Sequence, residues 1–359
     1  MNDCLKKIFE RIVRNDIIRE IIKRNHTVHV PVEKLPDNVN KRLFKNLPIN
    51  KALEKYNAYK SFVDYQRCVY CKNRTSLSEQ GFQGGVPWVG DLENASVLFL
   101  SSNPAFTWNQ CTPRYNAKSN NWTITYKNNE KVESEVIDEL DKVINFYKKP
   151  FGPGNLINLM EIINDNKKGS LLTVNIREDE RIIPKKGGVK FWNDLTEKVL
   201  IKLYENDDDK ELVKNWKKLI EEKAVFTEIV PFQSLGEEHI DSKILQLCWD
   251  SFSSKILSYS KANLWIVVGS QARNQLSQKM KNDGNFVPAD NGQMPDLETG
   301  KIYSLMYKDK YEKRPLTLWV IPHPNARPDA QNKFRSFNDF VEKITGDVWT
   351  ELIASLKCN

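Results

Sequence analysis

The sequence lacks the two features that would take the protein into or across a membrane. No stretch approaches the roughly 18 consecutive apolar residues that a membrane-spanning helix needs. Lysine, arginine and glutamate interrupt the N-terminal segment, where a secretory leader would have its apolar core. We therefore expect a cytoplasmic protein that has no membrane partner.

Regularly spaced cysteines and a flexible linker are missing as well. The six cysteines stand at irregular intervals, which favours free thiols or metal ligands over a disulfide framework. No stretch rich in proline, glycine and serine divides the 359 residues, so we expect one core that carries large insertions.

Positive charge is present in excess. The formal net charge is +7, charged residues make up 28% of the chain, and the mean hydropathy is −0.57. This composition is typical of a soluble globular protein, and the excess of lysine and arginine would suit a polyanionic partner such as nucleic acid. A solvated charged surface without such a partner is the alternative.

The stretch at residues 97–106, VLFLSSNPAF, is typical of a buried strand that ends in a polar turn. Pro104 removes a backbone donor and restricts Asn103 to an extended conformation, so we expect Asn103 to be held at the carboxyl end of the strand. Ligands of open α/β sheets bind at that end. An ordinary strand-to-loop turn is the alternative interpretation.

A second stretch near the C-terminus has the same construction. Residues 316–321, LTLWVI, are strand-like and are followed at once by PHPNARPD, which carries His323 and Arg327. Two further apolar runs, at residues 224–230 and 262–268, predict two more buried strands between these motifs.

Taken together, the SSNPAF and HPNAR turns resemble the two motifs of the uracil-DNA glycosylase superfamily. The resemblance implies an α/β fold, a three-layer α/β/α sandwich around a central four-stranded parallel sheet. It also implies catalytic roles for two residues: Asn103 would position the hydrolytic water, and His323 would donate a hydrogen bond to the departing base.

The same resemblance assigns residues that contact the base. Glu228 takes the place of an Asn that reads uracil in the family. An ionised carboxylate only accepts hydrogen bonds, so Glu228 favours an exocyclic amino group such as that of cytosine. Ala105 leaves room for a substituent at C5, and Phe151 is the stacking candidate. The expected base-binding residues are Ser102, Ala105, Phe106, Phe151 and Glu228.

Contacts to DNA are expected at two turns. GSQA, residues 269–272, resembles the family's turn into a helix, whose backbone N–H groups could hold a phosphate. Arg327 occupies the place of a wedge residue, with a phosphate contact as the alternative. The expected DNA-binding residues are Gly269, Ser270, Gln271, Arg273, Asn325 and Arg327.

The cysteines raise the question of a metal. Cys68 and Cys71 form a C-x2-C pair, which can bring two thiolates to one metal. In the iron-sulfur branch of the family two further cysteines follow, and here Cys248 matches one of them while Phe232 stands in place of the other. The chemistry requires no cofactor; an iron-sulfur cluster or zinc at Cys68, Cys71 and Cys248 is one alternative, and thiols without a metal are the other.

These observations predict the organisation of the chain. Residues 1–66 would form an N-terminal helical extension, with an amphipathic helix at 5–22, and residues 67–359 a glycosylase-like domain with insertions near 107–149 and 164–223. Residues 135–147 and 190–222 are helix-like, 283–299 loop-like, and 337–356 form a closing helix.

The expected function is that of a monomeric, monofunctional DNA N-glycosylase, a hydrolase that removes a flipped-out base. The expected base is cytosine-type or a C5-modified cytosine, as in defence against phage DNA. Repair of uracil or mismatches is the first alternative. A nucleic-acid-binding module without catalysis is the second.

Overall fold

The computed structural model describes most of the predicted strands and helices. The described residues are 1–14, 82–83, 85–102, 114–116, 119–128, 131–149, 174–175, 183–184, 194–205, 213–231, 242–289, 292–310, 312–324, 334 and 336–357. They belong to two compact units. The first unit comprises Met1–Pro87, Asn103–Phe146 and Val230–Ile256, and the second comprises Trp88–Ser102, Tyr147–Ile229 and Leu257–Asn359. The expected domain boundary after residue 66 lies outside the described residues.

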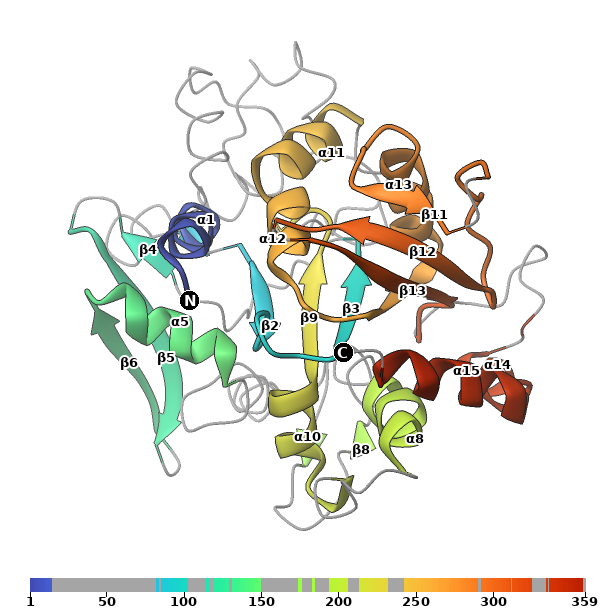
Figure 1. Ribbon diagram of the computed structural model, residues 1–359. Helices are drawn as coiled ribbons and strands as arrows, with labels where there is room; N and C mark the ends of the chain where they lie inside the picture. The colour runs from blue at the N-terminus through green and yellow to red at the C-terminus, as the bar shows by residue number, and fades with distance from the viewer. Residues whose placement is uncertain are drawn as a thin grey trace, which may run out of the picture. The chain divides into compact units, whose positions relative to one another are not determined.

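The second unit is built on a seven-stranded mixed sheet (Figure 1). In spatial order its strands are β11 (Phe286–Pro288), β12 (Ile302–Lys308), β13 (Lys313–Ile321), β10 (Leu264–Val268), β3 (Val97–Ser101), β9 (Ala224–Glu228) and β2 (Trp88–Gly90). The pairings among β13, β10, β3 and β9 are parallel, and the outer pairings are antiparallel. The α/β class is confirmed, but the sheet has seven strands where four were expected.

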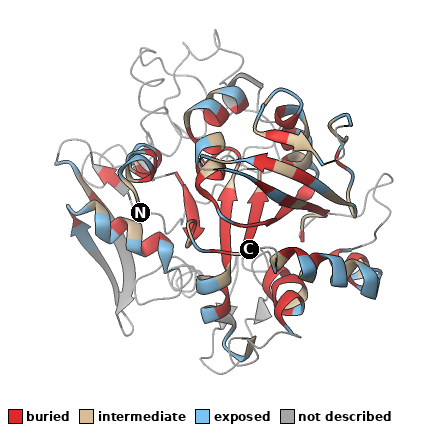
Figure 2. Ribbon diagram, viewed as in Figure 1, coloured by how far each residue is buried: buried red, intermediate tan, exposed pale blue. Residues whose placement is uncertain are grey.

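Burial explains why the central strands were recognisable in the sequence and the edge strands were not. Every residue of β10 is buried, as are the first four residues of β3. Figure 2 shows the buried colour along the central strands. Such runs are typical of parallel strands covered on both faces. By contrast, the start of β13 alternates exposed and buried residues where it pairs with β12. The expected loop at 283–299 contains β11, a short edge strand.

Aromatic side chains fill the space between the sheet and its helices. Phe99 and Phe226, which are register partners on β3 and β9, stack with ring centroids 4.6 Å apart. Trp319 of β13 contacts Phe340 and Trp349, with centroids 6.0 and 5.6 Å away. These two residues belong to α14 (Phe337–Glu342) and α15 (Gly346–Leu356).

The expected closing helix at 337–356 is therefore two helices. Ser336 caps α14 by accepting a hydrogen bond from the backbone N–H of Asp339, and α14 ends at Glu342. Thr345 has an extended backbone and begins a new helix, α15. Thr345 and Gly346 have low helix propensity, so the helix is interrupted here although the apolar spacing predicted a continuous one.

The helices that complete the second unit lie before β9 and after β10. Those in the described part are η4 (Thr196–Leu200), α8 (Ile201–Tyr204), α10 (Trp216–Lys223) and α13 (Gly269–Met280). Helices were expected over residues 190–222, and the described residues of that range confirm them. The helix α13 packs on β3, β10 and β13.

The first unit contains the helix α1 (Asp3–Val13), a four-stranded antiparallel sheet and the helices α11 (Ser242–Cys248) and η5 (Trp249–Ser253). The buried residues of α1 recur at helical spacing, as predicted: they are Leu5, Ile8, Phe9, Ile12 and Val13. Asn2 caps this helix through its side chain.

The four strands of the first unit are β1 (Phe82–Gln83), β4 (Arg114–Asn116), β5 (Asn121–Asn128) and β6 (Lys131–Ile137), in that spatial order. The expected helix at 135–147 is wrong at its start, because residues 135–137 complete β6 and α5 covers Leu140–Lys148. The remaining described elements are the paired strands β7 (Val174–Asn175) and β8 (Ile183–Pro184), and α12 (Ser254–Tyr259).

Among the described residues, no helix combines the length and apolar character that crossing a membrane requires.

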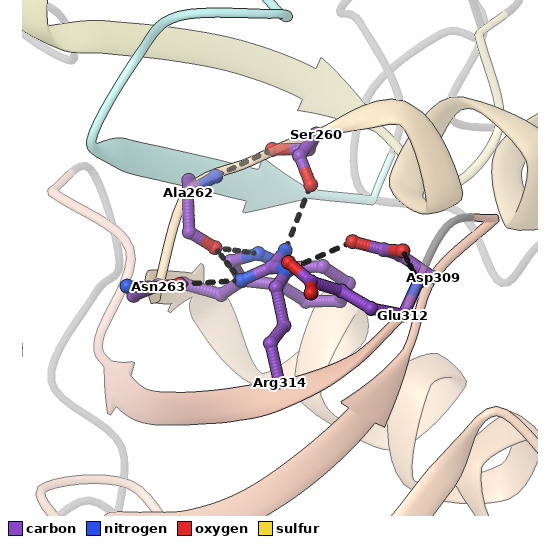
Figure 3. Close-up of polar contacts among 7 residues, drawn as sticks. Ser260, Ala262, Asn263, Asp309, Glu312 and Arg314 are labelled. Atoms are coloured by element: carbon purple, nitrogen blue, oxygen red, sulfur yellow. Dashed lines mark hydrogen bonds and ion pairs between the residues drawn. The ribbon is translucent and has the colours of Figure 1, made fainter. Parts of the chain in front are cut away.

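A buried arginine joins the β12–β13 turn to the start of β10 (Figure 3). The guanidinium of Arg314 donates to the carbonyl oxygens of Ser260 (2.7 Å) and Ala262 (2.9 Å) and to Oδ1 of Asn263 (2.7 Å). Its Nε lies 3.2 Å from Oδ2 of Asp309. These bonds satisfy three polar groups of a loop that leads into the central strand, so Arg314 holds the amino-terminal edge of the sheet together.

We expect Arg314→Met to lower the free energy of unfolding by about 3 kcal/mol or more, because Asp309 and two buried carbonyl groups lose the guanidinium. Urea unfolding followed by tryptophan fluorescence measures this. The matched control is Lys313→Met on the same strand, where the exposed side chain should contribute less than about 0.5 kcal/mol. Equal effects of the two substitutions would contradict a structural role for the Arg314 cluster.

Candidate functional site

Polar residues gather where the four parallel strands end. The residues Ser101 and Glu228 end β3 and β9 and are register partners, and Val268 and Ile321 are partners at the ends of β10 and β13. Because the strands are parallel, their carboxyl ends share one edge of the sheet, which is the edge where open α/β sheets bind ligands. We call this the carboxyl edge.

Glu228 is held at this edge by a serine. The hydroxyl of Ser101 donates a hydrogen bond to Oε2 of Glu228, and the backbone N–H of Ile229 donates to the carbonyl oxygen of Ser101 at 2.9 Å. Burial raises the pKa of the Glu228 carboxyl to about 8, although the bond from Ser101 acts in the opposite direction.

The interpretation of Glu228 from the sequence assumed an ionised carboxylate, and this raised pKa contradicts that assumption. At neutral pH the Glu228 carboxyl keeps its proton, so it offers one O–H donor as well as acceptor capacity. Glu228 is therefore not restricted to accepting from an amino group.

Four of the predicted residues meet at the start of α13. Gly269 has a φ of +89°, and a Cβ added to it would lie 3.2 Å from Cβ of His323. The hydroxyl of Ser102 donates to Oε1 of Gln271 at 3.2 Å, which joins the end of β3 to the first turn of the helix. The residue that precedes the helix, Val268, provides no side-chain cap.

His323 lies two residues after the end of β13 and is partly buried. Burial lowers the pKa of the imidazole to about 4, so the ring is neutral at physiological pH. A neutral imidazole has one N–H donor and one acceptor nitrogen. It can therefore donate a hydrogen bond to a group that becomes negative during a reaction.

The two other predicted DNA-contact residues on α13 are Ser270 and Arg273. Ser270 is exposed. The guanidinium of Arg273 bonds to Oδ1 of Asn274, at 3.1 and 2.9 Å, and to the hydroxyl of Thr299 at 3.2 Å. Arg273 is thus engaged along the helix surface.

Cys248, the predicted metal ligand that the structure describes, is buried in α11, where burial raises the pKa of its thiol. The metal site stays a prediction. No cluster of three or more metal-binding side chains occurs among the described residues. Cys68 and Cys71 lie outside them, and the chemistry proposed below uses no metal.

Several predicted site residues fall outside the described part of the chain. They are Asn103, Ala105, Phe106, Phe151, Asn325 and Arg327.

Ser101 joins the candidate site through Glu228, although the sequence did not single it out. In the sequence its only signal is its place as the fifth residue of the run that starts at Val97, the place that Glu228 has in the run that starts at Ala224. Recognising the pair requires the register between β3 and β9, which the structure supplies.

No family model matches the chain, and neither a curated protein nor a solved structure matches it.

We expect Gly269→Ala to lower the free energy of unfolding by about 1 to 2 kcal/mol, because alanine is strained at positive φ and its methyl group would press on His323. Gly284→Ala is the matched control, since an added Cβ there meets nothing within 4 Å and the backbone needs no positive φ. Urea unfolding compares the two variants. A larger loss in the control would contradict the tight packing of Gly269 on His323.

We expect Glu228→Gln to stabilise the protein relative to the wild type increasingly as the pH rises from about 5 to about 8. The folded wild type keeps the Glu228 proton up to about pH 8, while an unfolded glutamate loses it near its ordinary value of 4.5. The wild type therefore loses stability across this range, and the Gln variant does not.

The difference in unfolding free energy between the two proteins should grow by about 1 kcal/mol or more, since one pKa unit corresponds to about 1.4 kcal/mol. Unfolding curves at each pH measure it. Both proteins contain His323, so its titration contributes equally to the two unfolding free energies and cancels in their difference. Glu222→Gln, at an exposed glutamate of α10, is the control and should show no such growth. A constant difference for Glu228→Gln would show that Glu228 is ionised in the folded protein.

Proposed function

We propose that this protein is a DNA N-glycosylase of the uracil-DNA glycosylase type, which hydrolyses the bond between a flipped-out pyrimidine base and its sugar. One observation carries the proposal: Ser102, Glu228 and His323 lie at the carboxyl edge of four adjacent parallel strands. The resemblance of the two motif turns assigns base contacts to Ser102 and Glu228 and a catalytic hydrogen bond to His323.

The four parallel strands support the finer fold proposal. They occur at the four apolar runs that the resemblance selected, and they are neighbours in the sheet. We propose that they form the core of a three-layer α/β/α glycosylase fold. In this proposal, the antiparallel strands β11, β12 and β2 extend that core at its two edges.

The state of His323 suits the chemistry of base departure. Breaking the glycosidic bond leaves negative charge on the base, and a preorganised donor aimed at that charge stabilises the transition state. A neutral imidazole provides the donor without adding a positive charge to the ground state. In this mechanism Asn103 would position the attacking water, as the resemblance implies.

Glu228 fits the recognition of a pyrimidine edge. A neutral carboxyl offers a donor beside an acceptor, and cytosine offers the complementary pair, the acceptor N3 beside the donor N4. Uracil offers O4 beside N3–H, which is also complementary. The cytosine-type substrate therefore rests on Ala105, whose small side chain would leave room for a group at C5. Removal of modified cytosine from phage DNA is the biological setting that we propose.

The test is release of free base from DNA duplexes that contain uracil, cytosine or 5-hydroxymethylcytosine at one position. We expect the wild type to release a pyrimidine, and His323→Ala to lower the single-turnover rate by about a hundredfold to a thousandfold while DNA affinity changes little. Lys313→Ala, an exposed residue at the other end of β13, is the control and should keep the wild-type rate.

DNA binding without release of any base would overturn the proposal in favour of a binding module. Full activity of His323→Ala would overturn the role of His323.

A further inference from the structure

The pairing of Ser101 with Glu228 places a carboxyl group in an unusual environment. The pair lies on adjacent parallel strands as register partners, and the Ser101 hydroxyl donates to Oε2. Within the described part of the chain, Ser101 is the only side chain that hydrogen-bonds Glu228. A partly buried carboxyl held by one hydroxyl is costly to ionise when no cation offsets its desolvation.

The surrounding elements supply no such cation among the described residues. The strands on either side of Glu228, β2 (Trp88–Gly90) and β3 (Val97–Ser101), carry no ionisable side chain. Asp91, which follows β2, pairs with Lys148 at 2.8 Å, beyond the end of β2 that faces the start of β9. His323 follows β13, which β10 and β3 separate from β9, and it stays neutral above about pH 4.

The direction of the Ser101 bond also distinguishes the two carboxyl oxygens. A protonated carboxyl has a carbonyl oxygen, which accepts well, and a hydroxyl, which donates. When Oε2 accepts from Ser101, a neutral Glu228 has its carbonyl oxygen at Oε2 and carries its proton on Oε1. Ser101 thereby determines which oxygen of Glu228 is the donor.

We propose that Ser101 is a positioning residue that directs Glu228 to read the extruded base as a neutral acid, which donates one hydrogen bond from Oε1 to an acceptor atom of the base. This inference rests on the proposed glycosylase function and specifies its recognition step. The acceptor is O4 of a uracil-type base or N3 of a cytosine-type base, and these share the same chemistry. An ionised Glu228 would instead require a donor on the base.

The inference makes the rate depend on the protonated form of Glu228. As the pH rises past the pKa of about 8, Glu228 ionises and no longer has a proton to donate to the acceptor atom of the base. The rate of base release should therefore fall about tenfold or more between about pH 7 and about pH 9.5. Glutamine cannot ionise. With its amide oxygen accepting from Ser101, its NH2 group faces the base as the donor.

The experiment measures single-turnover base release by the full chain on matched uracil and cytosine-type duplexes across this pH range. We expect Glu228→Gln to remain active and to lose the decline at high pH. We expect Ser101→Ala to lower the rate near pH 7 by about tenfold, because the carboxyl is no longer oriented. The decline should also move to higher pH, since the lost hydrogen bond favoured the ionised form.

Ser101→Thr keeps the hydroxyl and should recover both the rate and the position of the decline, which a loss of folding could not mimic. Comparing the rates on the uracil and the cytosine-type duplexes shows whether Glu228 donates to O4 or to N3. A rate that rises with pH, an inactive but folded Glu228→Gln, or an unchanged pH profile in Ser101→Ala would overturn the inference while base release stands. Absence of release from every duplex would overturn the proposed function and this inference with it.

Discussion

Parallel pairing of four buried strands is the constraint on which the rest of the second unit depends. Parallel strands must be joined by crossovers, so segments far apart in the sequence end at the same edge. Glu228, Ser102, Gly269 and His323 are brought to one edge in this way, although up to 221 positions separate them in the sequence. The Arg314 cluster secures the opposite edge, where the loop into β10 meets the β12–β13 turn.

A single cause, burial, acts on both ionisable groups of the site with opposite signs. Burial penalises the charged form, so it raises the pKa of Glu228 and lowers that of His323. Both groups are consequently neutral near pH 7. Neutral groups of this kind can bind a ligand only through directed hydrogen bonds, for which the arrangement of donors and acceptors matters more than charge.

The sequence was sufficient to predict the strands at the buried centre of the sheet but not the strands at its edges. The runs that became β3 and β10 are almost wholly apolar because both faces are covered, and those of β9 and the second half of β13 are mostly apolar, so the signal is strong. The strands β11 and β12 carry mixed burial and depend on pairing for their identity. The state of Glu228 was also out of reach, because a sequence shows a glutamate but not how much water surrounds it.

A neutral recognition site has a consequence for how a basic protein would discriminate among bases. Attraction between lysines or arginines and phosphates is independent of sequence and would bring any DNA to the surface equally. Selection must then come from the cost of leaving a buried donor or acceptor unpaired, about 1 to 3 kcal/mol for each group. In the proposed recognition step, the pairing of Ser101 with Glu228 would sharpen that cost, because a carboxyl free to rotate could exchange its donor and acceptor oxygens, whereas one that accepts from Ser101 at Oε2 keeps its donor at Oε1.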